Sequence, residues 1–183
     1  MGNDFSQLLK HDEARWWVDR MYLQDTMKYV RKSTDPNTQV GASLVVDNGM
    51  GILLGRYNTV PDQLKRAGYP INTEDKNYCT EHAERKLIYD AVLNGLNVNG
   101  MTVYCNWATC SECARCMIQF GVKRVVTLSA VVERTPEKWR KSVWEGLSMM
   151  KNSGVSVVGW RGEIGVPVYF KFGGSIVTER DLI

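Results

Sequence analysis

The chain has 183 residues, which is a usual size for one domain and enough to bury a substantial core. Its formal net charge of +3 is mildly basic, and the Lys and Arg residues are scattered without forming a block. This balance suits a small phosphorylated ligand and is too weak to indicate a protein that binds nucleic acid.

The N-terminal part of the chain predicts one helix followed by a β-hairpin. Apolar side chains recur at helical spacing over residues 11–32, and Pro36 with its neighbours ends that helix. Residues 40–47 are predicted to form a strand that is buried on both faces. The turn signal Asp47-Asn48-Gly49 then precedes a returning strand at 52–58.

The segment 59–78 has no clear period and contains two prolines, a glycine and several charges. A loop of this length in a compact domain is usually functional. We interpret it as a flap near a pocket, and a plain surface insertion is the alternative.

The rest of the chain alternates between helices and strands. Thr80 is a good N-cap for a helix over residues 81–93, which Gly95 follows. Further helices are expected at 110–120 and 137–152, and further strands at 101–107, 123–130 and 155–160.

An opening hairpin followed by alternating elements predicts an α/β fold, a three-layer α/β/α sandwich with a five-stranded mixed sheet. We expect residues 1–183 to form a single domain with a core at about 20–160. The C-terminal extension 161–183 can add an edge strand through residues 166–172.

Five cysteines occur, and the first ten residues are polar, unlike a signal peptide. No apolar run reaches the length of roughly 18 residues that a membrane-spanning helix needs. We therefore expect a cytoplasmic protein in a reducing compartment, where clustered cysteines bind metals more often than they form disulfides.

His82 and two nearby cysteines predict a metal site. The chain has only two histidines, and His11 lies in a polar stretch far from any other ligand type, so His82 is the candidate nitrogen ligand. Cys110 and Cys113 fall at the start of a predicted helix, where the helix dipole lowers thiol pKa values. Zinc suits one imidazole and two thiolates, which leave a fourth position open. Glu84 would supply a carboxylate beside it.

Other interpretations of the cysteines remain open at this stage. Cys113 and Cys116 form a second C-x-x-C spacing, so a thioredoxin-like redox pair is one rival. We interpret Cys116 as a small buried apolar residue and Cys105 as part of the core. A structural zinc, with Cys116 or Cys79 as fourth ligand, is another rival that would leave Glu84 without a role.

The order His82-Ala83-Glu84 followed by Cys110-Ser111-Glu112-Cys113 resembles the signature of zinc-dependent nucleobase deaminases. With residues 33–42, which read STDPNTQVGA, and with Tyr57-Asn58, the chain resembles the cytidine deaminase superfamily. Within it, the chain is similar to the deoxycytidylate (dCMP) deaminases over about residues 20–160.

This resemblance implies a function and a set of residues. It implies Zn²⁺-dependent hydrolytic deamination of dCMP to dUMP, with Glu84 as the catalytic proton carrier. It implies zinc held by His82, Cys110 and Cys113, and substrate contacts at Asn58, Ala83 and Ala108. A homo-oligomer and regulation by dCTP and dTTP are also implied. The phosphate ligands stay open, with Lys32, Lys65, Arg66 and Arg115 as candidates.

The chain departs from the family pattern at several positions near the motifs. Thr109 stands where the family has proline, Arg56 and Thr59 flank the Tyr-Asn pair, and Lys86 replaces an asparagine. A substrate with a 5-substituted cytosine or another phosphate state is therefore a variant of the hypothesis. The remaining alternatives are a polynucleotide cytosine or adenine deaminase, a pteridine or riboflavin-pathway deaminase, and a zinc-stabilised, non-catalytic interaction subunit.

Overall fold

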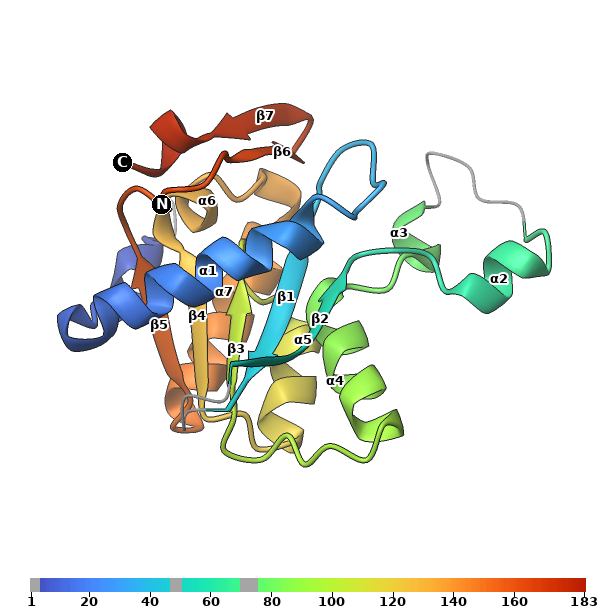
Figure 1. Cartoon of the computed structure of the whole chain (residues 1–183), viewed down its shortest axis with the longest axis horizontal. Helices are drawn as coiled ribbons and strands as arrows, with labels where there is room; N and C mark the ends of the chain where they lie inside the picture. The colour runs from blue at the N-terminus through green and yellow to red at the C-terminus, as the bar shows by residue number, and fades with distance from the viewer. Residues whose placement is uncertain (1–3, 47–50, 70–75) are drawn as a thin grey trace.

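The computed structural model describes residues 4–46, 51–69 and 76–183 (Figure 1). A five-stranded sheet in the order β2-β1-β3-β4-β5 forms its centre. The strands of this sheet are β1 (Gly41–Val45), β2 (Ile52–Tyr57), β3 (Thr102–Cys105), β4 (Arg124–Leu128) and β5 (Ser156–Trp160). A separate two-stranded sheet consists of β6 (Tyr169–Phe172) and β7 (Ser175–Thr178).

The sheet is mixed, as the sequence predicts. β1 is antiparallel to both β2 and β3, while β3, β4 and β5 are mutually parallel. The pairing of β1 with β2 confirms the hairpin, and its turn signal at residues 47–49 lies outside the described residues. Every residue of β1 is buried, which confirms that both of its faces are covered.

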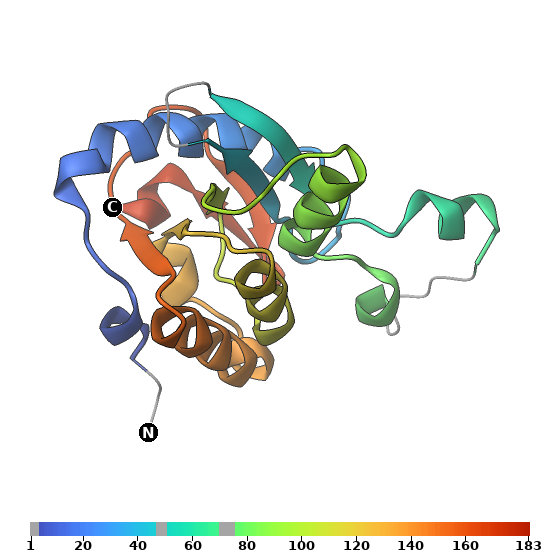
Figure 2. The same ribbon diagram turned by 90° about the horizontal axis from the view of Figure 1, so that it is seen from below.

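Helices cover both faces of the sheet. Figure 2 shows α1 on one side and α4, α5 and α7 on the other. The helices are α1 (Trp16–Val30), α2 (Asp62–Arg66), α3 (Lys76–Cys79), α4 (Ala83–Leu93), α5 (Ser111–Gln119), α6 (Ser129–Glu133) and α7 (Glu137–Asn152), with 3₁₀ turns η1 (Phe5–Leu8), η2 (Glu13–Arg15) and η3 (Glu179–Leu182). This arrangement confirms the three-layer α/β/α prediction. Among the described residues, no helix combines the length and apolar character needed to cross a bilayer.

Periodic apolar positions explain how the long helices pack. On α7, Val143, Leu147 and Met150 are fully buried at the spacing of one helical face. On α1, Leu23, Met27 and Val30 are buried in the same way. These apolar stripes pack the two helical layers against the sheet. The first residues of the helices are not needed for that packing and can be polar.

Three predictions about local structure are wrong in part. The segment 59–78 contains α2 and α3, two short helices that lack a long enough apolar period to be found from sequence. The tail does not extend the central sheet, because β6 pairs with β7 in a hairpin of its own. Helix α4 starts at Ala83, and Thr80 does not cap it, because the backbone of Glu81 pairs instead with Thr59.

Candidate active site

A cleft opens where the chain leaves β3 and where α4 and α5 begin. Its empty space, including the part open to solvent, is about 650 Å³. It is lined by Asp35, Asn37, Thr38, Val40, Asn58, Lys76, Asn77, Thr80, His82, Ala83, Glu84, Trp107, Ala108, Cys110, Lys138 and Trp139. The cleft therefore brings together segments that are up to about a hundred residues apart in sequence.

His82, Cys110 and Cys113 converge beside this cleft, which His82 and Cys110 line. The Nδ1 atom of His82 lies 3.4 Å from Sγ of Cys110 and 3.5 Å from Sγ of Cys113. Zinc bonds of about 2.0 Å to nitrogen and 2.3 Å to sulfur at a tetrahedral angle place such atoms about 3.5 Å apart. The donor set and its spacing therefore fit zinc, and three protein ligands leave a fourth vertex.

Two helix starts hold these ligands. His82 is the N-cap residue of α4 and Cys110 is the N-cap residue of α5, both in extended conformation. Cys113 lies in the first turn of α5. The free backbone N–H groups and the partial positive charge of each helix start favour thiolates there. Placing His82 at the cap rather than within the first turn corrects the predicted boundary by two residues.

The three ligand side chains shift one another's pKa values, because they lie close enough to share protons. The contact with Cys113 is the largest effect that lowers the pKa of Cys110, to about 4, and the contact with His82 adds to it. The contact with Cys110, together with burial, raises the pKa of Cys113 well above its ordinary value. Burial, the largest single effect, would lower the pKa of His82, but the hydrogen bond with Cys110 and the charges of Glu84 and Cys110 together leave that pKa raised. A metal cation bound by these three side chains would take the place of the protons that they share.

Glu84 lies beside the ligands with its side chain almost completely buried. It is 4% exposed, and it lines the cleft from the first turn of α4. Burial raises the pKa of Glu84 to about 7, against the opposing effect of His82. A carboxyl group with a pKa near neutrality can both accept and donate a proton, as a general acid and base must.

The remaining cysteines stay outside the metal-ligand group. In the part of the chain that the structure describes, that group contains only His82, Cys110 and Cys113. Cys105 is buried in the core, as predicted. Cys116 is only partly buried, although it packs against the core, and Cys79 is partly buried at the end of α3. A fourth protein ligand thus has no support within the described residues.

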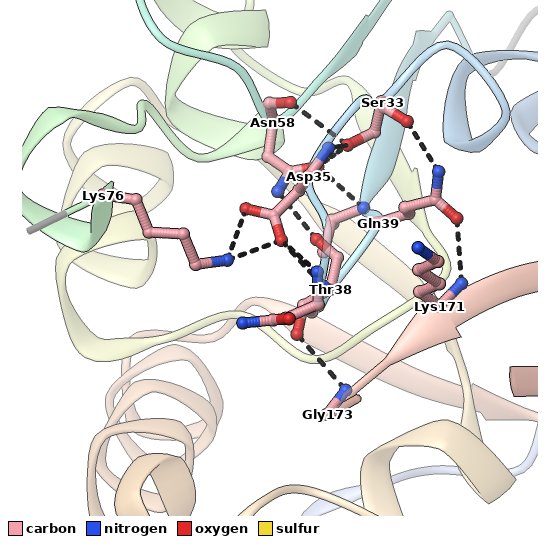
Figure 3. A network of polar contacts seen from close by, with 10 residues as sticks. Ser33, Asp35, Thr38, Gln39, Asn58, Lys76, Lys171 and Gly173 are labelled. Atoms are coloured by element: carbon pink, nitrogen blue, oxygen red, sulfur yellow. Dashed lines mark hydrogen bonds and ion pairs between the residues drawn. The ribbon is translucent and has the colours of Figure 1, made fainter. Parts of the chain in front are cut away.

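Asn58 lies at the cleft wall with its amide held on both sides (Figure 3). Its Oδ1 accepts hydrogen bonds from Oγ of Ser33 at 2.6 Å and from the backbone N–H of Val40 at 2.8 Å. Its Nδ2 donates to the carbonyl of Thr38 at 2.8 Å. Both oxygen lone pairs are used, so one Nδ2–H remains for a ligand.

Ala83 and Ala108 line the cleft as the sequence hypothesis requires, and two tryptophans that it did not single out complete the wall. The Trp139 ring lies 5.8 Å from the His82 ring, and the Trp107 ring lies 6.3 Å from that of Trp139. In the sequence Trp139 falls on the apolar stripe of α7, so the pattern predicts a core residue and not a cleft residue.

The cations of the cleft also differ from the predicted ones. Of the described residues, Lys76 and Lys138 line it, whereas Lys32, Lys65, Arg66 and Arg115 do not. Lys76 donates to both carboxylate oxygens of Asp35, at 2.6 and 2.9 Å. Lys138 is exposed, near the start of α7, and has no ion-pair partner among the described residues. No local sequence signal distinguishes it from a solvated lysine.

Three of the residues that depart from the family pattern do not line the cleft. Arg56 and Lys86 both form ion pairs with Asp90 on α4, and neither lines the cleft. Thr59 is likewise engaged elsewhere, since its Oγ1 accepts from Lys65. These three substitutions therefore leave the cleft itself unchanged.

The fold and the site together define a class of protein. It is the class of α/β/α proteins that carry a deaminase-type zinc centre with a carboxyl group beside it. The family model for the cytidine and deoxycytidylate deaminase zinc-binding region matches residues 18–129. The chain belongs to this family.

Two curated relatives and one solved structure illustrate the similarity. The chain is 30% identical over 131 residues to a probable deoxycytidylate deaminase of Drosophila melanogaster, covering 66% of this chain and 63% of that protein. It is 31% identical over 128 residues to the deoxycytidylate deaminase of Pongo abelii, covering 66% and 68%. The dCMP deaminase of cyanophage S-TIM5, in complex with dCMP and dUMP, has the same fold, with a TM-score of 0.62 at 20% identity over 78% of this chain and 96% of that one.

Proposed function

We propose that the protein hydrolyses the amino group of dCMP and releases dUMP and ammonia. The observation that carries this proposal is a buried carboxyl group beside a three-ligand zinc site, in the lining of one cleft. The relatives named deoxycytidylate deaminase, at about 30% identity, support the choice of dCMP.

His82, Cys110 and Cys113 would hold the ion, and each must be deprotonated at the ligating atom to do so. A zinc ion in such a site supplies Lewis acidity that brings the pKa of a coordinated water toward neutrality. The two helix starts contribute fixed positive charge around the thiolates, so the ligands keep their orientation whether or not substrate is present.

Glu84 would move two protons in sequence. Its carboxylate takes a proton from the attacking water and passes it to N3 of the cytosine ring while the water oxygen bonds to C4. The remaining hydroxyl proton then passes through Glu84 to the exocyclic amino group. The C4–N bond breaks, and ammonia leaves. One group can serve both steps because burial holds its pKa near 7, between the donor and the acceptor.

Cleft contacts would orient the nucleotide. Ala83 and Ala108 line the cleft together with Glu84, and their backbone groups would hydrogen-bond the base. The one free Nδ2–H of Asn58 can only donate, so it would bind an oxygen of the deoxyribose. The ammonium group of Lys138 at the start of α7 has no ion-pair partner among the described residues and would bind the 5′-phosphate. Lys76 already forms an ion pair with Asp35.

We also propose that copies of the chain associate and that dCTP and dTTP regulate the enzyme, as the family resemblance implies. An exposed apolar group on α1 supports the association, since Trp17 is 71% exposed and Met21 is 47% exposed. Sedimentation of the parent and of Trp17→Lys, each with and without either triphosphate, tests both statements.

The central test is ammonia release by zinc-loaded protein from dCMP, CMP, dCTP, 5-methyl-dCMP, deoxycytidine and a cytosine-containing oligonucleotide. We expect the highest kcat/KM with dCMP. Lys138→Ala should raise KM for dCMP by about tenfold, the effect of one charge-assisted hydrogen bond, and leave KM for deoxycytidine unchanged. Lys141→Ala, on the same helix but outside the cleft lining, is the control. Turnover of the oligonucleotide alone would overturn the proposal, and zinc binding without any turnover would favour an interaction subunit.

A further inference from the structure

The C-terminal hairpin β6–β7 packs against the cleft, although it lies beyond residues 18–129 that the family model matches. Its turn is Gly173-Gly174, with positive φ of 58° and 84° that side chains rarely adopt. Figure 3 shows the β6 end of the hairpin beside the segment that leads from α1 into β1. That segment, residues 37–39, supplies Asn37 and Thr38 to the cleft wall.

Four hydrogen bonds join the hairpin to this segment. The backbone N–H of Gln39 donates to the carbonyl of Lys171, and the N–H of Lys171 donates to Oε1 of Gln39, each at 2.8 Å. The N–H of Gly173 donates to Oγ1 of Thr38 at 3.2 Å. The N–H of Gly174 donates to the carbonyl of Asn37 at 3.0 Å. The hairpin thus pairs with the cleft wall much as an additional strand would.

The Gln39 side chain carries this connection to the Asn58 amide. While its Oε1 accepts from Lys171, its Nε2 donates to the carbonyl of Ser33 at 2.6 Å. Oγ of Ser33 in turn donates to Oδ1 of Asn58. Gln39 therefore bridges the hairpin and Asn58, a residue of the cleft wall with one Nδ2–H left for a ligand.

A second, apolar connection reaches the other wall. Phe172 is 4% exposed, and its ring lies 5.0 Å from that of Trp107 at an angle of 78°. Trp107 lines the cleft and meets Trp139, which meets the His82 ring. The Trp107 Nε1–H is fixed by a hydrogen bond to Oγ1 of Thr135 at 3.0 Å. Phe172 closes the side of Trp107 that faces the hairpin.

We propose that the C-terminal hairpin β6–β7 supports the wall of the substrate pocket, with Gln39 and Phe172 as positioning residues that fix the Asn58 amide and the Trp107 ring. Neither residue lines the cleft, so each acts through another side chain. The inference rests on the proposed function for its kinetic consequence, but its structural consequence is independent of it.

Two conservative variants separate positioning from folding. Phe172→Leu keeps the apolar volume and removes the flat ring, and Gln39→Glu keeps the contact with Lys171 while replacing the donor to Ser33 by an acceptor. Tyr169→Leu, 66% exposed on the same strand, and Gln119→Glu, exposed on α5, are matched controls. Zinc content, steady-state kinetics with dCMP and hydrogen exchange of residues 37–40, 57–60 and 106–108 are measured for each.

Both test variants should keep the zinc content of the parent, raise KM for dCMP about fivefold or more, and change kcat less than twofold, as loss of substrate positioning in the ground state does. Hydrogen exchange should rise about tenfold in the three segments and not in β4 or β5. Parent values in both variants, or a fall of kcat together with zinc content, would overturn the inference. An inactive parent removes the proposed function alone, and hydrogen exchange then decides the role of the hairpin.

Discussion

Two buried clusters of ionisable side chains in this protein have opposite organisation. The Asp19 cluster comprises Asp19, Tyr104 and Arg124 and joins α1 to the sheet. The ligand cluster comprises His82, Cys110 and Cys113, with Glu84 beside it. Only the first of the two is built from ion pairs between side chains of opposite charge.

In the Asp19 cluster every charge has a partner. Asp19 is fully buried and accepts hydrogen bonds from the Tyr104 hydroxyl at 2.7 Å and from the Arg124 guanidinium at 2.8 and 2.5 Å. Arg124 also pairs with Asp12. Burial, and then the adjacent Asp19 carboxylate, raise the pKa of Tyr104, which keeps its hydroxyl a donor. The cluster needs nothing from outside.

In the ligand cluster two sulfurs and an imidazole point their donor atoms at one place, and an acid group with a pKa near 7 is buried beside them. Two thiolates and an imidazole are the donor set of a metal cation, whose charge would balance that of the thiolates. The two clusters therefore differ in role. The ion-paired cluster stabilises the fold, and the metal-ligand cluster binds an ion from solution.

Removal of a ligand should have the largest effect on this contrast. Cys113→Ala should lose zinc and all measurable ammonia release, because two ligands remain. Chelation of the parent should lower its melting temperature by about 10 °C, since a tightly bound ligand contributes about 4 kcal/mol. The variant should melt like the chelated parent. Cys116→Ala, outside the ligand group, is the control, and zinc retention by Cys113→Ala at parental activity contradicts the assignment.

Glu84→Gln should separate metal binding from proton transfer. The amide cannot exchange protons, so kcat should fall by about 10²–10⁴-fold, the usual contribution of a general acid and base. Zinc content and dCMP affinity should stay near the parent values. Glu112→Gln, with a side chain 56% exposed between the two cysteine ligands, is the matched control. If Glu84→Gln kept parental turnover, another group would have to carry the protons.

Arg124→Met tests the Asp19 cluster. It leaves the buried Asp19 without its cation, so the free energy of unfolding should fall by about 3–5 kcal/mol in a denaturant titration. The double variant Asp19→Leu/Arg124→Met should recover part of that loss. Zinc content and KM should not change in either protein that remains folded. A loss of zinc affinity greater than the loss of stability would show that the two clusters are coupled.

Asp35→Asn probes a pair that lies between these extremes, since Asp35 and Lys76 line the cleft and yet satisfy each other. Burial would raise the pKa of Asp35, but hydrogen bonds from Lys76, Thr38 and Asn37 leave it lowered. The carboxylate therefore stabilises the fold above its unfolded pKa, and this contribution disappears as pH falls through the lower folded value.

At pH 7 we expect Asp35→Asn to lower the melting temperature by about 2–4 °C, which corresponds to about 1 kcal/mol. The difference should shrink as pH falls from 4 and vanish once the parent carboxylate is protonated. Asp25→Asn, at an exposed pair with Lys28, should show almost no difference at either pH. A constant difference at every pH would mean that charge is irrelevant to the pair.

How much the sequence predicts depends on how local the determining contacts are. The ligands were predictable because the chain has only two histidines and because His82 and the two cysteines fall at helix starts. Helix α7 was predicted with its observed bounds because its apolar stripe is complete within sixteen residues. The hairpin strands β1 and β2 followed from a run of apolar residues and a turn signal, which are equally local.

The features that sequence reasoning missed depend on approach in three dimensions. Gln39 meets Lys171 across 132 positions, so nothing near either residue predicts the pairing of the tail with the cleft wall. The start of α4 is displaced because the backbone of Glu81 pairs with Thr59, a contact that overrides the capping preference of Thr80. Lys138 and Trp107 could be assigned to the cleft only after α7 and the loop after β3 were placed together.

Thr109, which stands where the family has proline, gives the smallest expected effect. Its Oγ1 is buried without a hydrogen-bond partner among the described residues, as is Oγ1 of Thr127 in β4. Thr109→Val keeps the shape and removes the orphaned hydroxyl, so it should stabilise the protein by about 1 kcal/mol in a denaturant titration, and Thr127→Val should do the same. Thr135→Val is the opposite control, because that hydroxyl accepts from Trp107 and donates to the carbonyl of Val132. If Thr109→Val destabilised the protein as Thr135→Val does, the Thr109 hydroxyl would have to be hydrogen-bonded, and it would then belong with the satisfied polar groups of the fold.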